Sequence, residues 1–463
     1  TSIGSHAFEW LSGGLPSHLT IPARITDLGD YAFANCSCLE GVTFEGPEIW
    51  TGKYLLSGCK NLKEIHLSDG LTRIPDGFAS SCSSLSRLDL PDSVKTVGVG
   101  AFRDCTSLSD VKFSAALTTI SSNAFSSCSA LAGTLNLPDS VTTLDQYAFA
   151  YCSSLTGIRW PASLTTVGKE AFRSSGIAGH LDIPEGVSFD LDAFAYCDQI
   201  TSISLPSSSS YFKSGIFEDC DGLTSAVIPD GWTIIPAQMF WSCRNLTSVT
   251  LPESVQTIGA NAFSGCTSLP SIDLPEGLKN INGNAFAGCT SLSSIDLPEG
   301  LERIQGDAFS SCTGLPSLLV LPESLTELGD RTFKDSSVNT FRFLGNAPSW
   351  VCESGMYDST FNDNCVLYYT PGKSGWDSPT WNGYAAYAIL GKDNYEFHDA
   401  DYYSSLSQRN FDFIADVGPQ VEQPVSNVTL TYLGASATTA DGQTSISTAF
   451  VEEQPNSTVS FTQ

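Results

Sequence analysis

Apolar and polar residues follow one phrase along most of this chain, and the phrase returns about every 23 residues. Two near-identical copies stand in tandem at 268–289 and 291–312, SLPSIDLPEGLKNINGNAFAGC and SLSSIDLPEGLERIQGDAFSSC. Between Ile3 and Phe343 the chain consists of variants of this phrase. Self-similarity at a short, fixed period is the signature of a solenoid, in which every repeat forms one coil of similar shape.

The order of residues within the phrase predicts the parts of a coil. In the segment 292–297, Leu-Ser-Ser-Ile-Asp-Leu, apolar and polar residues alternate, which predicts a strand with one buried face. Pro298 has no N–H to donate and should end that strand, and the acidic residue and glycine behind it favour a turn. The next apolar pair, as in Leu278 and Ile281, predicts a short second strand on the opposite side of the coil.

The Ala-Phe pair and the cysteine should fill the turn that leads back to the next strand. One coil cannot enclose its apolar residues alone, so we expect a mainly β solenoid of about fifteen coils with parallel sheets and a C-terminal cap. Three copies, at 131–135, 177–181 and 315–319, carry one extra residue before the strand. Two others, at 175–177 and 336–338, lack the cysteine and one further residue, which predicts a tighter turn there.

The chain has 15 cysteines, most of them at one position of the phrase, and no C-x-x-C. Stacked in register, the repeated cysteines predict a column of small, buried, reduced thiols. Cys38 is out of phase with this column. Cys352 and Cys365 lie outside the array, and they are the pair best placed to form a disulfide, with the unbridged state as the alternative.

The repeated motif LPxxLxxIxxxAFxxCxxLxxIxLP resembles the BspA-like, or treponemal, class of bacterial leucine-rich repeats, and it covers residues 1–343. The resemblance implies an exported, surface-displayed protein, and some members of the class are adhesins for host matrix proteins. The segment GWDSPTWNGY resembles the closing module of some bacterial leucine-rich-repeat proteins. We therefore interpret residues 344–416 as a capping segment.

An aromatic, glycine-rich segment such as 344–416 is also compatible with a carbohydrate platform, so that alternative stays open. Its rings include Trp350, Tyr368, Tyr369, Trp376, Trp381 and Tyr384. Residues 417–463 begin with a proline-containing linker and continue as a Ser/Thr-rich tail with a possible small β element around 428–432.

The charge balance narrows the class of partner. The chain has 50 acidic and 22 basic residues, a net charge of −28, so nucleic acid and anionic membrane surfaces are poor partners. No apolar run reaches the roughly 18 residues of a membrane span, so we expect no membrane insertion. The chain opens at Thr1 in the back half of a repeat, from which we expect a fragment or a processed form.

The residue types needed for catalysis do not gather into a motif. His6, His18, His66, His180 and His398 never have metal-ligand spacing, and HExxH, G-x-S-x-G, P-loop and G-x-G-x-x-G motifs are missing from the sequence. We expect no catalytic site, no cofactor and no metal, and therefore no enzyme.

Two rows of exposed positions remain as candidate sites. The residue after Leu-Pro is acidic in many coils, which predicts a ladder of carboxylates along one edge, either simply solvated or able to bind cations. The ladder consists of Asp92, Asp139, Glu185, Asp230, Glu253, Glu276, Glu299 and Glu323.

The second row consists of the outward positions of the first strand in each coil. These positions are charged and varied in the first half of the array and small, mostly serine, from Ser202 onward. Recognition requires diversity, so we predict that a ligand contacts the varied part. The predicted ligand-binding residues are Glu64, His66, Arg87, Asp89, Asp110, Lys112 and Arg159.

The sequence therefore favours a non-enzymatic binding or adhesion module, at the cell surface or secreted, that recognises a host or neighbouring-cell protein or glycan. The alternative is a structural spacer that presents another domain of a larger surface protein. A spacer should tolerate deletion of an internal repeat and have no saturable ligand, whereas a binding module should lose its ligand.

Overall fold

The computed structural model describes residues 1–46, 52–351, 360–362, 364–378, 380–389, 431–432, 435–438 and 460–462. It divides the chain into two compact units, Thr1–Val366 and Leu367–Gln463. The first unit contains the repeats, stacked as about 16 turns of ~23 residues with almost no helix. A single short 3₁₀ turn, η1 (Ser209–Tyr211), interrupts the described coils. The expected solenoid is confirmed.

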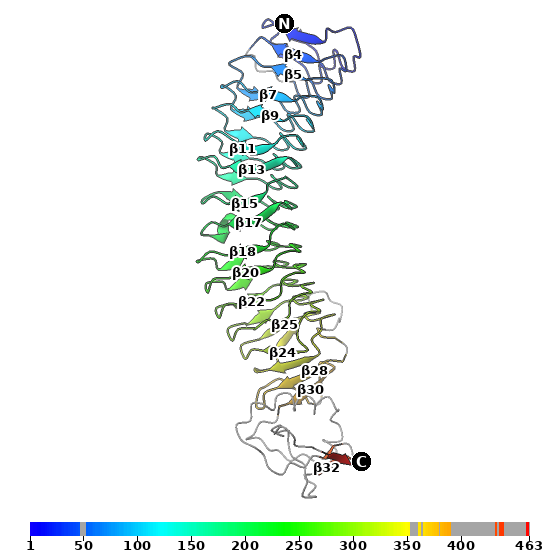
Figure 1. Ribbon diagram of the computed structural model, residues 1–463, viewed down its shortest axis with the longest axis vertical. Coiled ribbons are helices and arrows are strands. Elements are labelled where there is room, and N and C mark those ends of the chain that lie inside the picture. Colours follow the sequence, from blue (N-terminus) through cyan, green and yellow to red (C-terminus); the bar gives the residue numbers. More distant parts are fainter. Residues whose placement is uncertain are drawn as a thin grey trace. The chain divides into compact units, whose positions relative to one another are not determined.

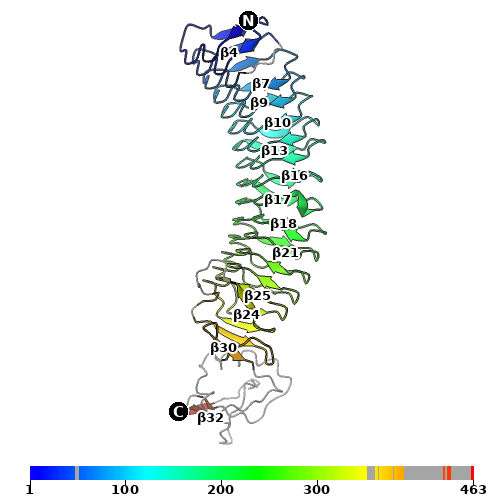
Figure 2. The ribbon, with the colours of Figure 1, turned by 180° about the vertical axis from the view of Figure 1, so that it is seen from behind.

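The first strands of successive coils form a row of short sheets with parallel pairing between neighbouring coils, and they follow in chain order in Figures 1 and 2. The strands are β2 (His18–Ile21), β4 (Gly41–Phe44), β5 (Glu64–His66), β7 (Arg87–Asp89), β9 (Asp110–Lys112), β11 (Gly133–Asn136), β13 (Leu155–Arg159), β15 (Gly179–Asp182), β17 (Ile200–Ser204), β18 (Ser225–Val227), β20 (Ser248–Thr250), β24 (Leu318–Leu321) and β26 (Thr340–Phe343). The alternating apolar residues point inward, and a proline follows most of these strands, although β5 and β9 have no proline before the next short strand. In the two near-identical coils at 268–312 the first strand is reduced to an isolated parallel bridge between Ser271 and Ser294, so the strand predicted at 292–297 is not formed.

The second apolar pair of each phrase forms two-residue or three-residue strands, which also pair in parallel from coil to coil. Ile281 lies in such a strand, which confirms the predicted second sheet. The strands are β1 (Ser2–Ile3), β3 (Asp27–Leu28), β6 (Arg73–Ile74), β8 (Thr96–Val97), β10 (Thr119–Ile120), β12 (Thr143–Leu144), β14 (Thr166–Val167), β16 (Ser188–Phe189), β19 (Ile234–Ile235), β21 (Thr257–Ile258), β22 (Asn280–Ile281), β23 (Arg303–Ile304), β25 (Glu327–Gly329) and β27 (Ser349–Val351).

The Ala-Phe turn closes the third side of the coil and has its own ladder of hydrogen bonds. The Phe125 N–H donates to the Ala148 carbonyl of the next coil at 2.9 Å, and the Ser127 N–H donates to the Ala150 carbonyl at 2.8 Å. The residue before Ala and the second residue after Phe have a left-handed backbone, as at Asn123 (φ 58°) and Ser127 (φ 61°). We call the outward side chains of this turn the turn face.

The phenylalanines of the turn form a continuous core column. From Phe102 to Phe333 successive rings stack with centroids 5.3–6.2 Å apart. Phe286 and Phe309 are fully buried, as predicted. Parallel coils at constant spacing place identical side chains in register, so one ring per coil is enough to fill the centre of the solenoid.

The cysteine column is buried beside the phenylalanines, as predicted, and its thiols are unbridged. Each thiol donates to a carbonyl of the preceding coil, as from Cys128 Sγ to the Phe102 carbonyl at 3.2 Å. In the two shortened coils, Ser175 and Ser336 occupy the cysteine position and are buried there. Serine thus replaces cysteine at a position that requires a small hydrogen-bond donor.

The extra residue of the longer coils is absorbed locally in two of the three cases. The register of the first sheet shifts between Gly133 and Thr134 and again between Gly179 and His180. Both glycines have a positive φ, 76° and 75°, so each forms a bulge at little cost.

The second unit contains small strands. β28 (Val366–Tyr369) starts at the last residue of the first unit and continues into the second. β29 (Thr380–Trp381) pairs with β30 (Tyr384–Ala388) in an antiparallel hairpin. Strands β31 (Thr431–Tyr432), β32 (Ala435–Thr438) and β33 (Ser460–Thr462) pair in antiparallel fashion, and the proposed division of the chain after residue 343 stays a prediction. The capping and carbohydrate-platform hypotheses for 344–416 stay predictions. Cys365 is buried, but Cys352 lies outside the described residues, as do 390–430, so the disulfide also stays a prediction.

Candidate functional site

The outward side chains of β5, β7, β9 and β13 form an exposed surface, which we call the sheet face. In β5 and β7 the central residues Ile65 and Leu88 are buried, and the residues on both sides of them are exposed. The seven predicted ligand-binding residues are all exposed. Their outward orientation is therefore confirmed, whereas their role in binding stays a prediction.

The charges of the sheet face form small groups. Arg87 lies 3.2 Å from Asp89 on its own strand and 3.2 Å from Asp110 on the next coil. Its guanidinium is more than half exposed, and ion pairs at such positions contribute only about 0–1 kcal/mol. The sheet face is thus charged, but these pairs contribute little to folding.

Two of the seven residues have partners outside the predicted set. Glu64 lies 2.9 Å from His18 of β2 and 3.6 Å from His66. Arg159 lies 3.3 Å from Asp139, a member of the acidic row.

Lys112 forms no ion pair with any described residue, and Asn136 separates it from Arg159 along the sheet. The structure therefore divides the predicted site into a Glu64–His66 group, an Arg87–Asp89–Asp110 group with Lys112 beside it, and a separate Arg159.

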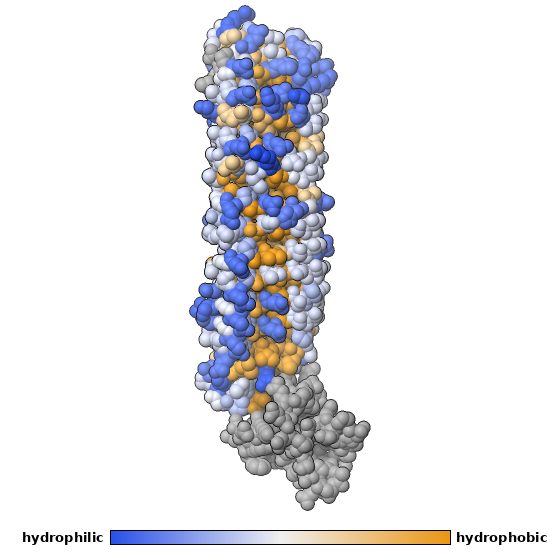
Figure 3. Space-filling model, turned by 60° about the vertical axis from the view of Figure 1, so that its left-hand side comes forward, coloured by the Kyte–Doolittle hydropathy of each residue, from blue (hydrophilic) through white to orange (hydrophobic). Residues whose placement is uncertain are grey.

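Beyond β15 the outward residues on the same side of the coils are small and mostly uncharged. Both ring nitrogens of His180 have hydrogen-bond partners, with Nδ1 2.8 Å from Ser202 Oγ and Nε2 3.0 Å from Asp182 Oδ1. Further along, small side chains leave Val227 63% exposed. Figure 3 shows apolar side chains along one stripe of the repeat array, interrupted by polar patches.

The acidic row is exposed along its whole length. Within the described residues, no group of three or more His, Cys, Asp or Glu side chains is arranged to hold a metal ion. Mutual repulsion along the row predicts raised pKa values, but the pKa of the Asp139 carboxyl is lowered by the Ala162 N–H and by Arg159. Asp139 is therefore not one of the raised groups, because these two local donors stabilise its ionised form.

A second polar cluster lies on the turn face of the coils from Tyr147 to Arg244, and the sequence reasoning did not identify it. Its centre is Glu170, whose side chain is only 10% exposed. The Tyr147 hydroxyl donates to Glu170 Oε1 at 2.7 Å, and Lys169 and Arg173 lie 3.4 and 3.3 Å from its carboxylate. The hydrogen bond to Glu170 raises the pKa of Tyr147 to about 12.

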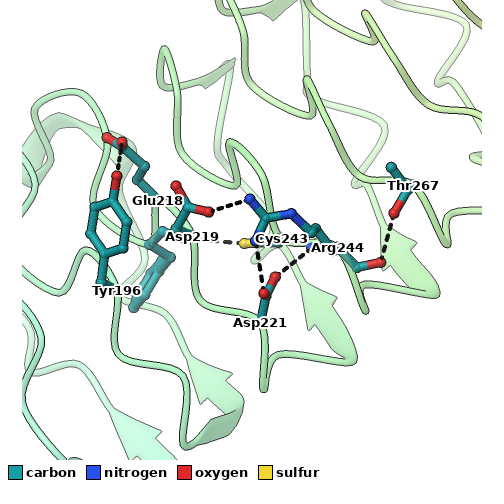
Figure 4. Close-up of polar contacts among 8 residues, drawn as sticks. Tyr196, Glu218, Asp219, Asp221, Cys243, Arg244 and Thr267 are labelled. Carbon is teal, nitrogen blue, oxygen red and sulfur yellow. Dashed lines mark hydrogen bonds and ion pairs between the residues drawn. The ribbon is translucent and has the colours of Figure 1, made fainter.

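The cluster continues into the next coils. The Arg173 guanidinium lies over the ring of Tyr196, 4.2 Å from its centroid. The Tyr196 hydroxyl donates to Glu218 Oε1 at 3.4 Å. Figure 4 shows Tyr196 and Glu218 facing each other, with a neighbouring group in which Arg244 contacts both Asp219 (3.0 Å) and Asp221 (2.8 Å).

The repeats can now be compared with known proteins. A family model for the BspA type leucine rich repeat region matches residues 1–132, 133–247 and 233–350, in six copies. The chain belongs to the BspA-type leucine-rich-repeat family. This assignment confirms the resemblance carried by the repeated motif. Leucine-rich-repeat proteins are typically involved in protein binding, and their fold is generally non-enzymatic.

Two solved structures are similar to this chain. A leucine-rich repeat protein from Bacteroides ovatus is 27% identical with a TM-score of 0.58, and the match covers 71% of this BspA-type chain and 92% of that chain. A leucine rich cell surface protein from Faecalibacterium prausnitzii is 28% identical with a TM-score of 0.47, over 72% of this chain and 89% of that chain. No curated protein matches the chain. Among the described residues, no helix is long and apolar enough to cross a bilayer.

A sequence signal for the turn-face cluster exists in the BspA-type phrase. The two left-handed positions hold Asn, Gly or Ser in many coils, which are residues suited to that conformation. Tyr147, Tyr151 and Tyr196 occupy the same positions with φ values of 56–62°. Bulky side chains at these positions depart from the repeat, and reading the two columns separately would have revealed them.

Proposed function

We propose that this protein is a non-enzymatic binding module, displayed at the cell surface or secreted, that contacts a protein partner through the sheet face. The observation that carries the proposal is the abrupt change along one surface. From β5 to β13 the outward residues include acidic, basic and imidazole groups, whereas from β17 to β20 they are serine, threonine and valine.

The exposed cations favour a contact role over a folding role. Lys112 forms no ion pair among the described residues, and the pairs of Arg87 and Arg159 lie at positions more than half exposed. Arginine contributes strongly to protein interfaces because its guanidinium donates several hydrogen bonds at once. The surface location is supported by membership of the BspA-type family.

A triple variant tests this proposal. The assay is a panel of immobilised extracellular proteins and glycans, and the partner is any member that captures the parent protein. The triple variant Arg87→Ser, Lys112→Ser, Arg159→Ser should melt at nearly the same temperature as the parent and should no longer bind that partner. The matched control replaces Ser202, Ser225 and Ser248 with alanine and should bind like the parent. If the first triple variant binds every panel member as the parent does, the sheet face is not the contact surface.

The spacer function is supported by a different observation, the unbroken column of stacked phenylalanines from Phe102 to Phe333. A continuous core gives the array mechanical continuity regardless of its surface. Deletion of residues 268–290 removes one phrase and preserves the register of the rest. A spacer should still present its attached domain after this deletion and should show no saturable ligand on the panel. A binding module should bind a panel member and lose that binding after the deletion.

A further inference from the structure

The turn face between Tyr147 and Arg244 has the composition of a protein contact surface. It presents Tyr147, Tyr151, Arg173, Tyr196, Trp241 and Arg244 within five successive coils. Tyr, Trp and Arg are the residue types enriched in the energetically dominant parts of interfaces. In neighbouring coils the same columns carry mostly Ser, Ala, Gly and Asn. The aromatic and charged residues thus differ from the coils on either side, although Trp10, Tyr31 and Tyr54 occupy the same columns in the first coils.

Apolar area is exposed within this surface. Tyr151 is 45% exposed and Leu191 is 37% exposed, and both belong to the few large apolar or aromatic residues exposed in the described part of the chain. The backbone conformation adds to the contrast, because a left-handed φ at Tyr151 or Tyr196 costs about 1–2 kcal/mol relative to glycine. Tyr196 offsets this cost through its contacts with Arg173 and Glu218, whereas the Tyr151 side chain forms no hydrogen bond among the described residues.

The charges of the surface are not balanced. Glu170 and Asp219 have cationic partners, but Asp192 and Glu218 form no ion pair among the described residues. These two carboxylates converge above Gly215, where a Cβ atom would lie 1.9 Å from Asp192 Oδ1 and 3.5 Å from Glu218 Oε2. Gly215 has a positive φ of 74°, and because it lacks a Cβ the Asp192 carboxylate can lie directly against it.

Burial and neighbouring charge disfavour the ionised form of both groups. Desolvation, followed by the charge of Glu170, raises the pKa of Asp192. Desolvation, followed by the charges of Asp192 and Asp219, raises the pKa of Glu218. Arg173, which lies over the Tyr196 ring, already offsets part of this repulsion at both carboxylates, and an arriving cation would offset more of it.

We propose that this turn-face surface docks a basic segment of a protein partner, with one lysine or arginine side chain entering between Asp192 and Glu218. The net charge of −28 favours approach of such a segment from solution. Tyr151, Leu191 and Tyr196 provide the apolar contacts around the inserted cation. This contact is separate from the sheet face and does not depend on it.

The test uses a fluorescein-labelled oligolysine peptide and measures its affinity by fluorescence anisotropy, with an oligoglutamate peptide for comparison. Asp192→Asn together with Glu218→Gln should weaken oligolysine binding about tenfold. The double variant should fold like the parent, because neutral amides avoid the cost of two ionised, half-buried carboxylates; circular dichroism checks this. The sheet-face triple variant should bind the peptide like the parent, which keeps this test distinct from the first.

The matched control removes the same charge elsewhere. Glu253→Gln with Glu276→Gln neutralises two fully exposed members of the acidic row. Non-specific attraction to an acidic protein would fall equally in both double variants, whereas specific docking falls only in the first. Equal loss in both, equal binding of oligoglutamate, or no oligolysine binding by the parent each overturns the proposal. Glycan binding at this surface without peptide binding overturns it as well.

Discussion

Replacement of Phe286 by alanine tests the central claim about the core, that one stacked ring per coil holds the solenoid together. Phe286 is fully buried, and its ring stacks on Phe263 at 5.4 Å and on Phe309 at 5.3 Å. Loss of a buried phenylalanine costs about 3–5 kcal/mol, and aromatic contacts add to the burial term. With rings on both sides, we expect the upper end of that range, about 4–5 kcal/mol.

Because each coil contacts only its neighbours, the damage should be largest near the substitution. Hydrogen exchange measured by mass spectrometry should therefore show faster exchange in the coils from 240 to 333 than near residue 102, together with an earlier urea transition. Phe8→Ala is the matched control, because Phe8 is partly exposed and the ring contact of Phe8 in the structure is on Phe33 alone. If Phe286→Ala unfolds at the parent's urea concentration, or if Phe8→Ala costs as much, the reasoning is refuted.

Two further predictions concern buried polar groups. Burial raises the pKa of the Cys105 and Cys152 thiols to about 12. Both thiols should therefore resist a thiol reagent at neutral pH and react fully after denaturation. Disulfides between successive coils, found by mass spectrometry without reduction, would contradict this. Glu170→Ala removes the shared acceptor of Tyr147, Lys169 and Arg173 and should lower the free energy of unfolding by about 1–3 kcal/mol. Exposed Glu253→Ala should change it little, and equal effects in urea unfolding would contradict the assigned burial of Glu170.

Most of the interior follows from the sequence because the period fixes it. Once Phe286 and Phe309 stand one repeat apart in parallel coils, they must lie in one column, and the same holds for the cysteines. The proline after most of the first strands and the glycines at 133 and 179 likewise act through backbone rules that are local and strong. These are positions where steric and hydrophobic terms agree, so the prediction needs no knowledge of individual contacts.

The surface follows less closely from the period. Arg159 belongs to the same column as Lys112, yet its side chain pairs with Asp139 in the neighbouring turn. Long exposed side chains select among several partners that differ by less than about 1 kcal/mol, and a repeat pattern contains no information at that level. The shortened coils show a similar limit, since the sequence indicates a missing cysteine there whereas Ser175 fills the cysteine position.

The turn face shows where functional information lies in such a protein. Inward positions are constrained by the neighbouring coils, so they repeat, and their repetition reports only the fold. Outward positions are free to vary, so a departure from the column, such as the 45% exposed Tyr151 at a left-handed position, needs an explanation other than packing. The sequence reasoning applied this comparison to the strands alone. The same comparison applied to the turns leads to Asp192 and Glu218, and this makes the turn face the more informative surface on which to search for a partner.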